Sequence, residues 1–417
     1  MKAAGTTEAA GTFQALRRAW LNWVRSLYTG YFSCVMATGI VSVALLLNST
    51  LALSYILWAL GFIFLAFLVV VYSLRGVRYS RELGRDFANP ATAFGFFTFI
   101  AGLGVMATRS ALGGWTVVPA ILTIVAVIAW FGLTYWLFAS LTFTNQKPIE
   151  QALNGSWLIA IVATESLAIT WVLLIAIAPA LRDTLQLVAY AFWTFGVLLY
   201  LIFITLIIYR FFFLRVRPQD LSPPYWINMG AMAITTVAGV RLLQAPHPSA
   251  FLTALHPYIE GFTVMMWAWG TWWIPLLLII GVWKYFVARE PIRYQPALWS
   301  IVFPLGMYAT ALQLLSHIPG LAILETLGPT ATWIAFAAWL AVALGWLWSA
   351  ITAGRQAIRQ TIPSSAARPS AARHVAPDTN TPSDHAAQTR FAAQGTARDT
   401  QQQTHSDDEG LTVQHTK

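Results

Sequence analysis

Ten long apolar runs dominate this sequence, and they limit its fold more than any other feature. A helix that crosses the hydrocarbon layer of a bilayer needs about twenty apolar residues, and helices and closed barrels are the structures that pair every backbone polar group within that layer. The runs therefore predict an all-α integral membrane protein with ten transmembrane helices. They occupy residues 29–47, 51–74, 90–112, 115–141, 155–179, 184–213, 225–245, 259–287, 297–319 and 328–353.

The composition agrees with a protein that faces lipid. Hydrophobic residues make up 58% of the 417 residues and charged residues 10%, which is too apolar for a soluble domain to cover with polar surface. The formal net charge of +9 is spread over short loops rather than gathered on one face, so we expect no nucleic-acid partner. One cysteine, Cys34, cannot form a disulfide or a cysteine-based zinc site within the chain. We expect neither a metal nor another cofactor.

Along the chain, loops that are rich in lysine and arginine alternate with loops that contain few of them. The rich loops follow the even-numbered runs, and cytoplasmic loops are the ones that collect basic residues. The other side receives only Arg109, Arg182 and Arg241. This distribution predicts a multi-pass protein of the plasma (inner) membrane with both termini in the cytoplasm. The rich side receives the amino terminus and Arg75, Arg78, Arg81, Arg85, Lys147, Arg210, Arg215, Arg217, Lys284, Arg289, Arg293, Arg355 and Arg359.

Three segments follow from these patterns. Residues 1–28 include a basic amphipathic stretch, which we expect to be retained and to lie along the cytoplasmic surface. Residues 29–353 form the ten-helix transmembrane domain. Residues 354–417 are polar and lack apolar periodicity, which predicts a disordered cytoplasmic tail, either a solvated extension or a segment that binds a partner.

The loops on the outer side are short after the first, third, fifth and ninth runs, which predicts five antiparallel helical hairpins in succession. The odd-numbered runs also share an opening pattern, an aromatic residue followed by small residues, at 31–39, 157–166, 226–239 and 299–306. This pattern indicates an internal repeat. Interfacial belts of tryptophan and tyrosine alone would produce a similar pattern.

Glu165 lies near the middle of the fifth run. A carboxyl group at that depth is costly and usually faces a bundle interior or a water-filled path. Two interpretations fit: a proton-carrying site, or a hydrogen-bonded glutamate that holds neighbouring helices together. Because an ionised carboxylate would oppose the passage of anions, we expect Glu165 to be neutral or off the axis of any anion path.

Two further features point toward a pathway for ions. Arg109 and Arg241 lie near the outer side, where they could attract anions to a mouth, although a long basic side chain near a helix end is also ordinary. Pro304 removes a backbone hydrogen bond inside the ninth run. Phe303, which precedes it, could then project into a central path as an apolar plug or simply pack in the core.

Motifs for catalysis do not stand out. The sequence contains no phosphate-binding loop, metal-ligand cluster or nucleophile elbow, and its histidines lie in an outer loop, at a membrane edge or in the tail. We therefore expect that the protein is not an enzyme.

Three stretches of the odd-numbered runs resemble a known family. Residues 30–40 are similar to the opening helix of the tellurite-resistance/dicarboxylate transporter family, 224–231 to its seventh helix and 299–304 to its ninth. The family includes bacterial TehA, yeast malate and sulfite transporters and plant slow-type anion channels. The resemblance covers roughly residues 28–352.

This resemblance implies ten helices in five hairpins, with the odd helices around a central pore and a homotrimer with one pore per subunit. It implies that Phe303 is the pore gate. Proline is less regular here than in the family, so Gly39, Gly104 and Gly230 are candidates for bends. Together with Thr38 and Pro304 they are the candidate pore-lining or bend positions.

The leading hypothesis is transport of small inorganic or organic anions through this pore, gated by Phe303, within a lipid bilayer. One alternative is a proton-coupled dicarboxylate transporter or sulfite exporter in which Glu165 takes the proton. Another is a membrane sensor or scaffold that acts through its tail. The sequence does not identify the ion, because selectivity depends on pore radius and field strength.

Overall fold

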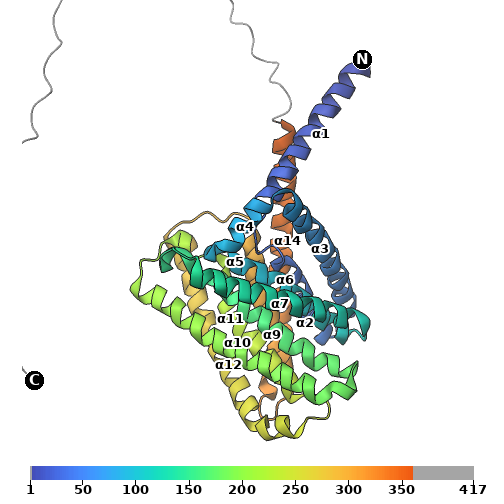
Figure 1. Ribbon diagram of the computed structural model, residues 1–417, viewed down its shortest axis with the longest axis vertical. Coiled ribbons are helices and arrows are strands. Elements are labelled where there is room, and N and C mark those ends of the chain that lie inside the picture. Colours follow the sequence, from blue (N-terminus) through green and yellow to red (C-terminus); the bar gives the residue numbers. More distant parts are fainter. Residues whose placement is uncertain (1, 360–417) are drawn as a thin grey trace, which may run out of the picture. The chain divides into compact units, whose positions relative to one another are not determined.

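Two sets of helices, one buried and one exposed, make up the transmembrane part of the chain. A computed structural model describes residues 2–359, which contain helices and connecting turns and no strand (Figure 1). The five inner helices are α2 (Ser33–Leu47), α6 (Phe97–Leu112), α9 (Ile159–Leu173), α11 (Ile227–Leu243) and α13 (Trp299–Leu315). The five outer helices are α3 (Leu51–Arg78), α7 (Val117–Phe143), α10 (Arg182–Phe213), α12 (Ala250–Val282) and α14 (Leu327–Arg359).

Shorter helical segments lie at the loops. The amino-terminal helix α1 spans Lys2–Arg25, and α4 spans Ser80–Ala88 between the first two hairpins. The others are α5 (Pro90–Ala93), η1 (Phe94–Phe96), α8 (Ile149–Ala152), η2 (Gly155–Leu158), η3 (Leu174–Ala176), η4 (Pro179–Leu181), η5 (Pro218–Asp220), η6 (Pro223–Trp226), the π-helical turn η7 (Trp283–Val287), η8 (Pro296–Leu298) and η9 (Ala322–Thr326).

Burial separates the two sets. In four of the inner spans 72–83% of the most apolar stretch is buried, whereas the five outer spans bury 11–44%. Large apolar side chains such as Ile128, Leu198 and Ile279 are exposed along the outer helices. Apolar surface of this extent is stable against lipid and not against water. Within the described residues, nine spans are long and apolar enough to cross a membrane, and α2 is a shorter apolar helix. The predicted ten-helix membrane fold is confirmed.

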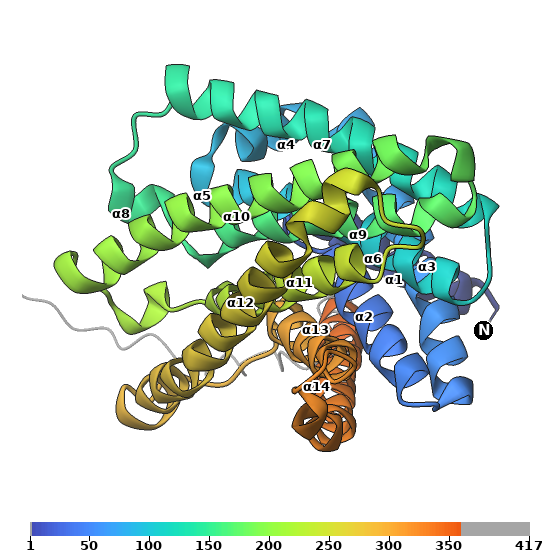
Figure 2. The same ribbon diagram turned by 90° about the horizontal axis from the view of Figure 1, so that it is seen from below.

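The inner helices form a closed ring. Contacts join α2 to α6, α6 to α9, α9 to α11, α11 to α13, and α13 back to α2. Each inner helix also packs along the outer helix that follows it in the chain. In Figure 2 the inner helices accordingly lie toward the middle, with α7, α12 and α14 outside them. The five predicted hairpins therefore surround one axis.

The inner helices all begin at the same end of the ring, which we call the basic end because its loops carry Arg78, Lys147, Arg215 and Arg293. Some boundaries differ from those expected. Helix α12 begins at Ala250 rather than residue 259, since the hydroxyl of Ser249 caps it by accepting from the backbone N–H of Leu252. Helix α14 continues to Arg359, and the remainder of the predicted tail lies outside the described residues.

Candidate functional site

A small cavity lies inside the ring, and each inner helix contributes two residues to it. The two residues of each pair are three positions apart, so they share one helix face. Its volume is about 10 Å³, close to the smallest space that holds one water molecule. The lining pairs are Ile40 and Val43, Val105 and Thr108, Ser166 and Ile169, Ile234 and Val237, and Met307 and Thr310, with Arg241 in addition.

Arg241 is the charged residue of this cavity. The hydroxyls of Ser166 and Thr310 donate to carbonyl groups of their own helices. The half-buried Arg241 has a buried Nε with no hydrogen-bond partner in the part of the chain that the structure describes. A guanidinium group is a strong donor to anions. The cavity therefore presents an unused cationic donor among mainly apolar walls.

Phe303 and Pro304 lie nearer to the basic end. Phe303 is 1% exposed and precedes the cavity residue Met307 by about one helical turn, on the same face of α13. Pro304 packs closely on α11: a Cβ atom added at Gly230 would lie 2.8 Å from Cγ of Pro304. The ring is thus tightly closed at this level.

A wider space opens at the basic end. This vestibule has a volume of about 400 Å³ and is lined by residues from the starting segments of all five inner helices. Thr29, Gly95, Ser156, Pro224 and Ala297 represent these segments. The vestibule therefore lies on the same axis as the small cavity, with the level of Phe303 between them.

Charged side chains line the vestibule, and its two arginines bind other groups of the protein. Arg210 is buried; its Nη1 donates to the carbonyl of Leu153 and, over 3.1 Å, to the Tyr225 hydroxyl. Arg217 Nη2 lies 3.2 Å from Asp220 Oδ1. Hydrogen bonding from Arg217 lowers the pKa of Asp220 below its ordinary value. The sequence identified these arginines only as markers of topology, although Arg210, at the end of an apolar run, was a signal for a buried cation.

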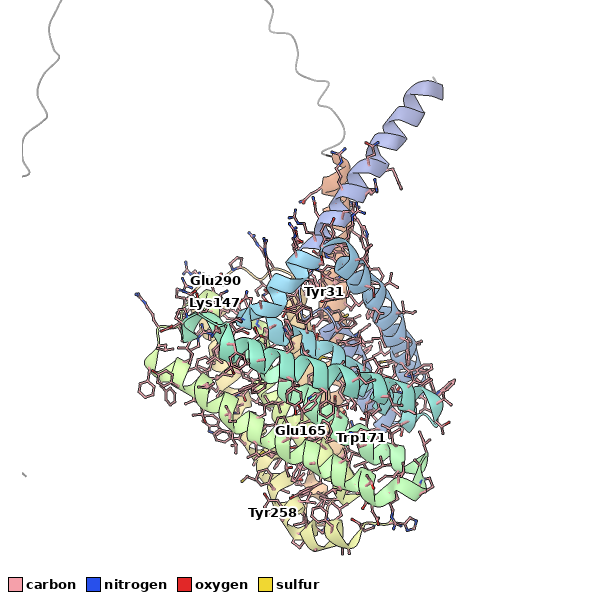
Figure 3. The ribbon with its side chains drawn as sticks, viewed as in Figure 1. Tyr31, Lys147, Glu165, Trp171, Tyr258 and Glu290 are labelled. Carbon is pink, nitrogen blue, oxygen red and sulfur yellow. The ribbon has the colours of Figure 1, made fainter. Side chains whose placement is uncertain are left out.

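Glu165 faces away from the cavity. Its Oε1 accepts a hydrogen bond of 3.1 Å from the hydroxyl of Thr235 on α11. A Cβ atom added at Gly196 of α10 would lie 2.8 Å from its Cδ. Its Oε2 is buried and has no hydrogen-bond partner among residues 2–359. In Figure 3 Glu165 lies between Tyr31 and Tyr258, away from either end of the bundle. The carboxyl group therefore sits between α9, α10 and α11, behind Ser166.

Arg109 is not at the cavity. Its Nε donates to the hydroxyls of Ser42 and Ser54, over 2.9 and 3.1 Å, and its guanidinium lies 5.0 Å from the centroid of the Tyr55 ring. It thus ties α6 to the first hairpin. Of the two candidate arginines, the structure brings Arg241 and not Arg109 to the axis.

The remaining candidates lie at contacts between helices. The hydroxyl of Thr38 accepts a hydrogen bond of 2.9 Å from the Trp339 indole on α14. A Cβ atom added at Gly39 would lie 2.8 Å from Cγ1 of Val105, and one at Gly104 would lie 2.7 Å from Cβ of Ser166. These two glycines permit α6 to approach α2 and α9 closely.

Five hairpins around one axis, with spaces at two levels of it, define a multi-pass membrane protein of the channel and transporter class. Residues 27–347 match the SLAC1 family, described as voltage-dependent anion channel. The chain belongs to this family, and the resemblance noted in the sequence is confirmed.

Relatives agree with this membership. An uncharacterized membrane protein of Mycobacterium tuberculosis is 43% identical over 139 residues, which is 32% of this chain and 68% of the relative. Two uncharacterized transporters of Methanocaldococcus jannaschii are 22% and 25% identical over 337 and 338 residues, 76% of this chain and 93% and 92% of theirs.

Proposed function

We propose that this protein conducts small anions along the axis of the inner ring and that Phe303 closes the path. The supporting observation is the matched contribution of all five inner helices to both the vestibule and the small cavity. Phe303 lies on the cavity-facing side of α13 between these two spaces. An apolar ring at a constriction excludes hydrated ions.

The distribution of basic residues supports an orientation in the plasma membrane. Loops rich in Lys and Arg belong on the cytoplasmic side, so the vestibule is the cytoplasmic mouth and both termini are cytoplasmic. Arg241 then lies toward the outer side, where its free Nε receives an anion that has shed water. A single cation in a mainly apolar space binds strongly enough to admit an anion and, lacking further donors, weakly enough to release it.

The path is complete within one chain, since all five lining helices belong to it. We propose a homotrimer with three separate pores, as the family resemblance implies. Light scattering of the purified protein in detergent, corrected for bound detergent, gives the subunit number. A monomer with full flux would refute the proposed trimer and leave the proposed pore unaffected.

Flux in liposomes tests the gate. Replacing Phe303 with Ala should raise chloride and nitrate flux about tenfold or more, because the apolar constriction is removed. Phe203→Ala is the matched control, since Phe203 is also buried but lies on the outer helix α10. Equal flux in wild type, Phe303→Ala and Phe203→Ala, at equal amounts of folded protein, would refute the gate.

Glu165 supports a second candidate function, proton-coupled movement of a dicarboxylate or sulfite. The supporting observation is its fully buried carboxyl group with one oxygen unpartnered in the described chain. Under this alternative, Glu165→Gln abolishes uptake of malate or sulfite driven by a pH gradient. Thr235→Val is the control, because it removes the hydroxyl donor and keeps the carboxyl group. If Glu165→Gln keeps both the flux and its response to the pH gradient, this alternative is excluded.

A further inference from the structure

An open apolar groove lies between the first two hairpins, away from the axis of the ring. Its volume is about 660 Å³, within the range of sites that bind small organic ligands. None of its lining residues is charged. Most of them come from α3, α4 and α7 and from the segment that starts α6, and they include Val69, Phe87, Phe96 and Trp136.

The groove opens toward lipid and is covered at the basic end by α4. Val69 on α3 and Trp136 on α7, which line it, are exposed apolar residues of two outer helices. Helix α4 contacts α3, α5 and α7 (Figures 1 and 2). Phe87 of α4 stacks on Phe96 with ring centroids 3.9 Å apart. The groove therefore extends from the basic surface into the apolar layer.

Helix α4 separates its charges onto two flanks. Glu82 and Asp86 pair with Arg25 and Arg75, at 2.8 and 2.6 Å. On the other flank, which adjoins Gly84, lie Arg81 and Arg85, one turn apart. Both are exposed, and neither forms an ion pair within residues 2–359. The acidic residues are thus paired, whereas two exposed arginines, Arg81 and Arg85, remain on the helix that covers the groove, next to its lining residue Gly84.

We propose that this groove binds an anionic phospholipid of the cytoplasmic leaflet. One acyl chain lies against the apolar lining, and the phosphate accepts hydrogen bonds from Arg81 and Arg85. Arginine is suited to phosphate because its donors match two oxygens at once, and anionic lipids collect basic segments at the cytoplasmic surface. The assignment of this lipid to the cytoplasmic leaflet rests on the proposed orientation of the protein. The groove and the charges of α4 do not depend on that orientation.

An occupied groove would also support the inner ring. Phe96, Phe99 and Ile100 belong to the segment that starts the second inner helix, and they form one wall of the groove. A lipid chain there stabilises the position of α6, whose residues Val105 and Thr108 line the cavity. Bound anionic lipid should therefore influence conduction without entering the pore.

Native mass spectrometry of the full chain in detergent tests the headgroup. The probes are phosphatidylglycerol and phosphatidylcholine with identical acyl chains. Phosphatidylglycerol should bind about tenfold more tightly than phosphatidylcholine, and the Arg81→Ala/Arg85→Ala protein should bind both equally. Arg215→Ala/Arg293→Ala is the control, since both arginines are exposed in other loops of the basic end. Equal binding of both lipids to wild type would overturn the anionic headgroup.

A second pair of variants tests the groove. Gly132 lines it, and nothing lies within 4 Å of a Cβ atom added there, so Gly132→Leu fills space without a clash in the protein. Gly281 on α12 is equally open and lies outside the groove. Gly132→Leu should reduce binding of both lipids about tenfold, and Gly281→Leu should not. If Gly132→Leu changes the subunit number and leaves lipid binding intact, a second copy of the chain covers the groove and the proposal fails.

Discussion

The vestibule and the small cavity lie on one axis but differ in size and in the state of their charges. The vestibule measures about 400 Å³ and contains Arg210, Arg217, Asp220 and Glu150. The cavity measures about 10 Å³ and contains Arg241. Arg210 donates to Leu153 and Tyr225 through Nη1, although its Nε is unpartnered, and Arg217 pairs with Asp220. Arg241 makes no side-chain hydrogen bond within residues 2–359, and its buried Nε has no partner there.

This contrast suggests two roles for a cationic side chain in a pore wall: it holds protein segments together, or it is available to bind an anion. A guanidinium that already donates to buried carbonyl and hydroxyl groups holds segments together, and removing it leaves those acceptors unpaired. A guanidinium without partners has a donor free for an ion. We therefore expect the vestibule arginines to matter for folding and Arg241 to matter for conduction.

The largest effect should follow from Arg241→Gln. It removes the cavity's charge and keeps a polar side chain, and a charge-assisted hydrogen bond contributes about 1.5–3 kcal/mol, so anion flux should fall about tenfold or more. Arg182→Gln is the control, because Arg182 is partly exposed and already pairs with Asp183 at 2.9 Å. Anion flux is measured for both variants in liposomes. Unchanged flux in Arg241→Gln would contradict the proposed difference between the two sites, because Arg241 would then have no role in conduction.

Arg210→Met should act on stability instead. The carbonyl of Leu153 and the hydroxyl of Tyr225 lose a buried donor, which costs about 1–3 kcal/mol. The unfolding temperature in detergent should fall by several degrees, while flux per folded protein changes less than in Arg241→Gln. Arg217→Met is the control, since exposed pairs contribute about 1 kcal/mol or less. An unfolding temperature equal to that of wild type would show that Arg210 is not a structural tie.

The sequence predicts the hairpins and the ring well, because apolar runs and alternating basic loops depend on local composition. It does not separate Arg109 from Arg241. Both lie in the last turn of an inner helix, and the difference arises because Ser42 and Ser54 of another hairpin reach Arg109. Which arginine stays free depends on packing between segments distant in the chain.

The position of Glu165 is likewise not predictable from the sequence. Its neighbour Ser166 lines the cavity, while Glu165 packs toward Gly196 on an outer helix. Successive residues of a helix point about 100° apart, so the rotation of α9 about its own axis decides which of the two residues faces the cavity. The fifth run is apolar on nearly all sides, and its sequence therefore contains little information about which face meets the axis.

The smallest effect concerns pH. The pKa of Asp220 is lowered, chiefly by hydrogen bonding from Arg217. A group whose pKa is lower in the folded state contributes stability above its unfolded pKa, about 3.9 for aspartate, and loses that contribution as the pH falls through the folded value. The Arg217–Asp220 pair should therefore stay intact from pH 8 to about pH 5 and weaken only in stronger acid.

Unfolding temperatures of wild type and Asp220→Asn, measured across this range, test the pairing. The difference between the two proteins should be constant from pH 8 to about pH 5 and shrink in stronger acid, because protonated wild type then resembles the variant. Because Arg217 is exposed and the other contact of Asp220, with Arg210, is 4.0 Å long, the constant difference should be small, about 1 kcal/mol or less. A difference that already shrinks between pH 7 and 6 would mean that Asp220 binds a proton near neutrality. The vestibule would then contain unpaired cations at physiological pH, and its contrast with the cavity of Arg241 would not hold.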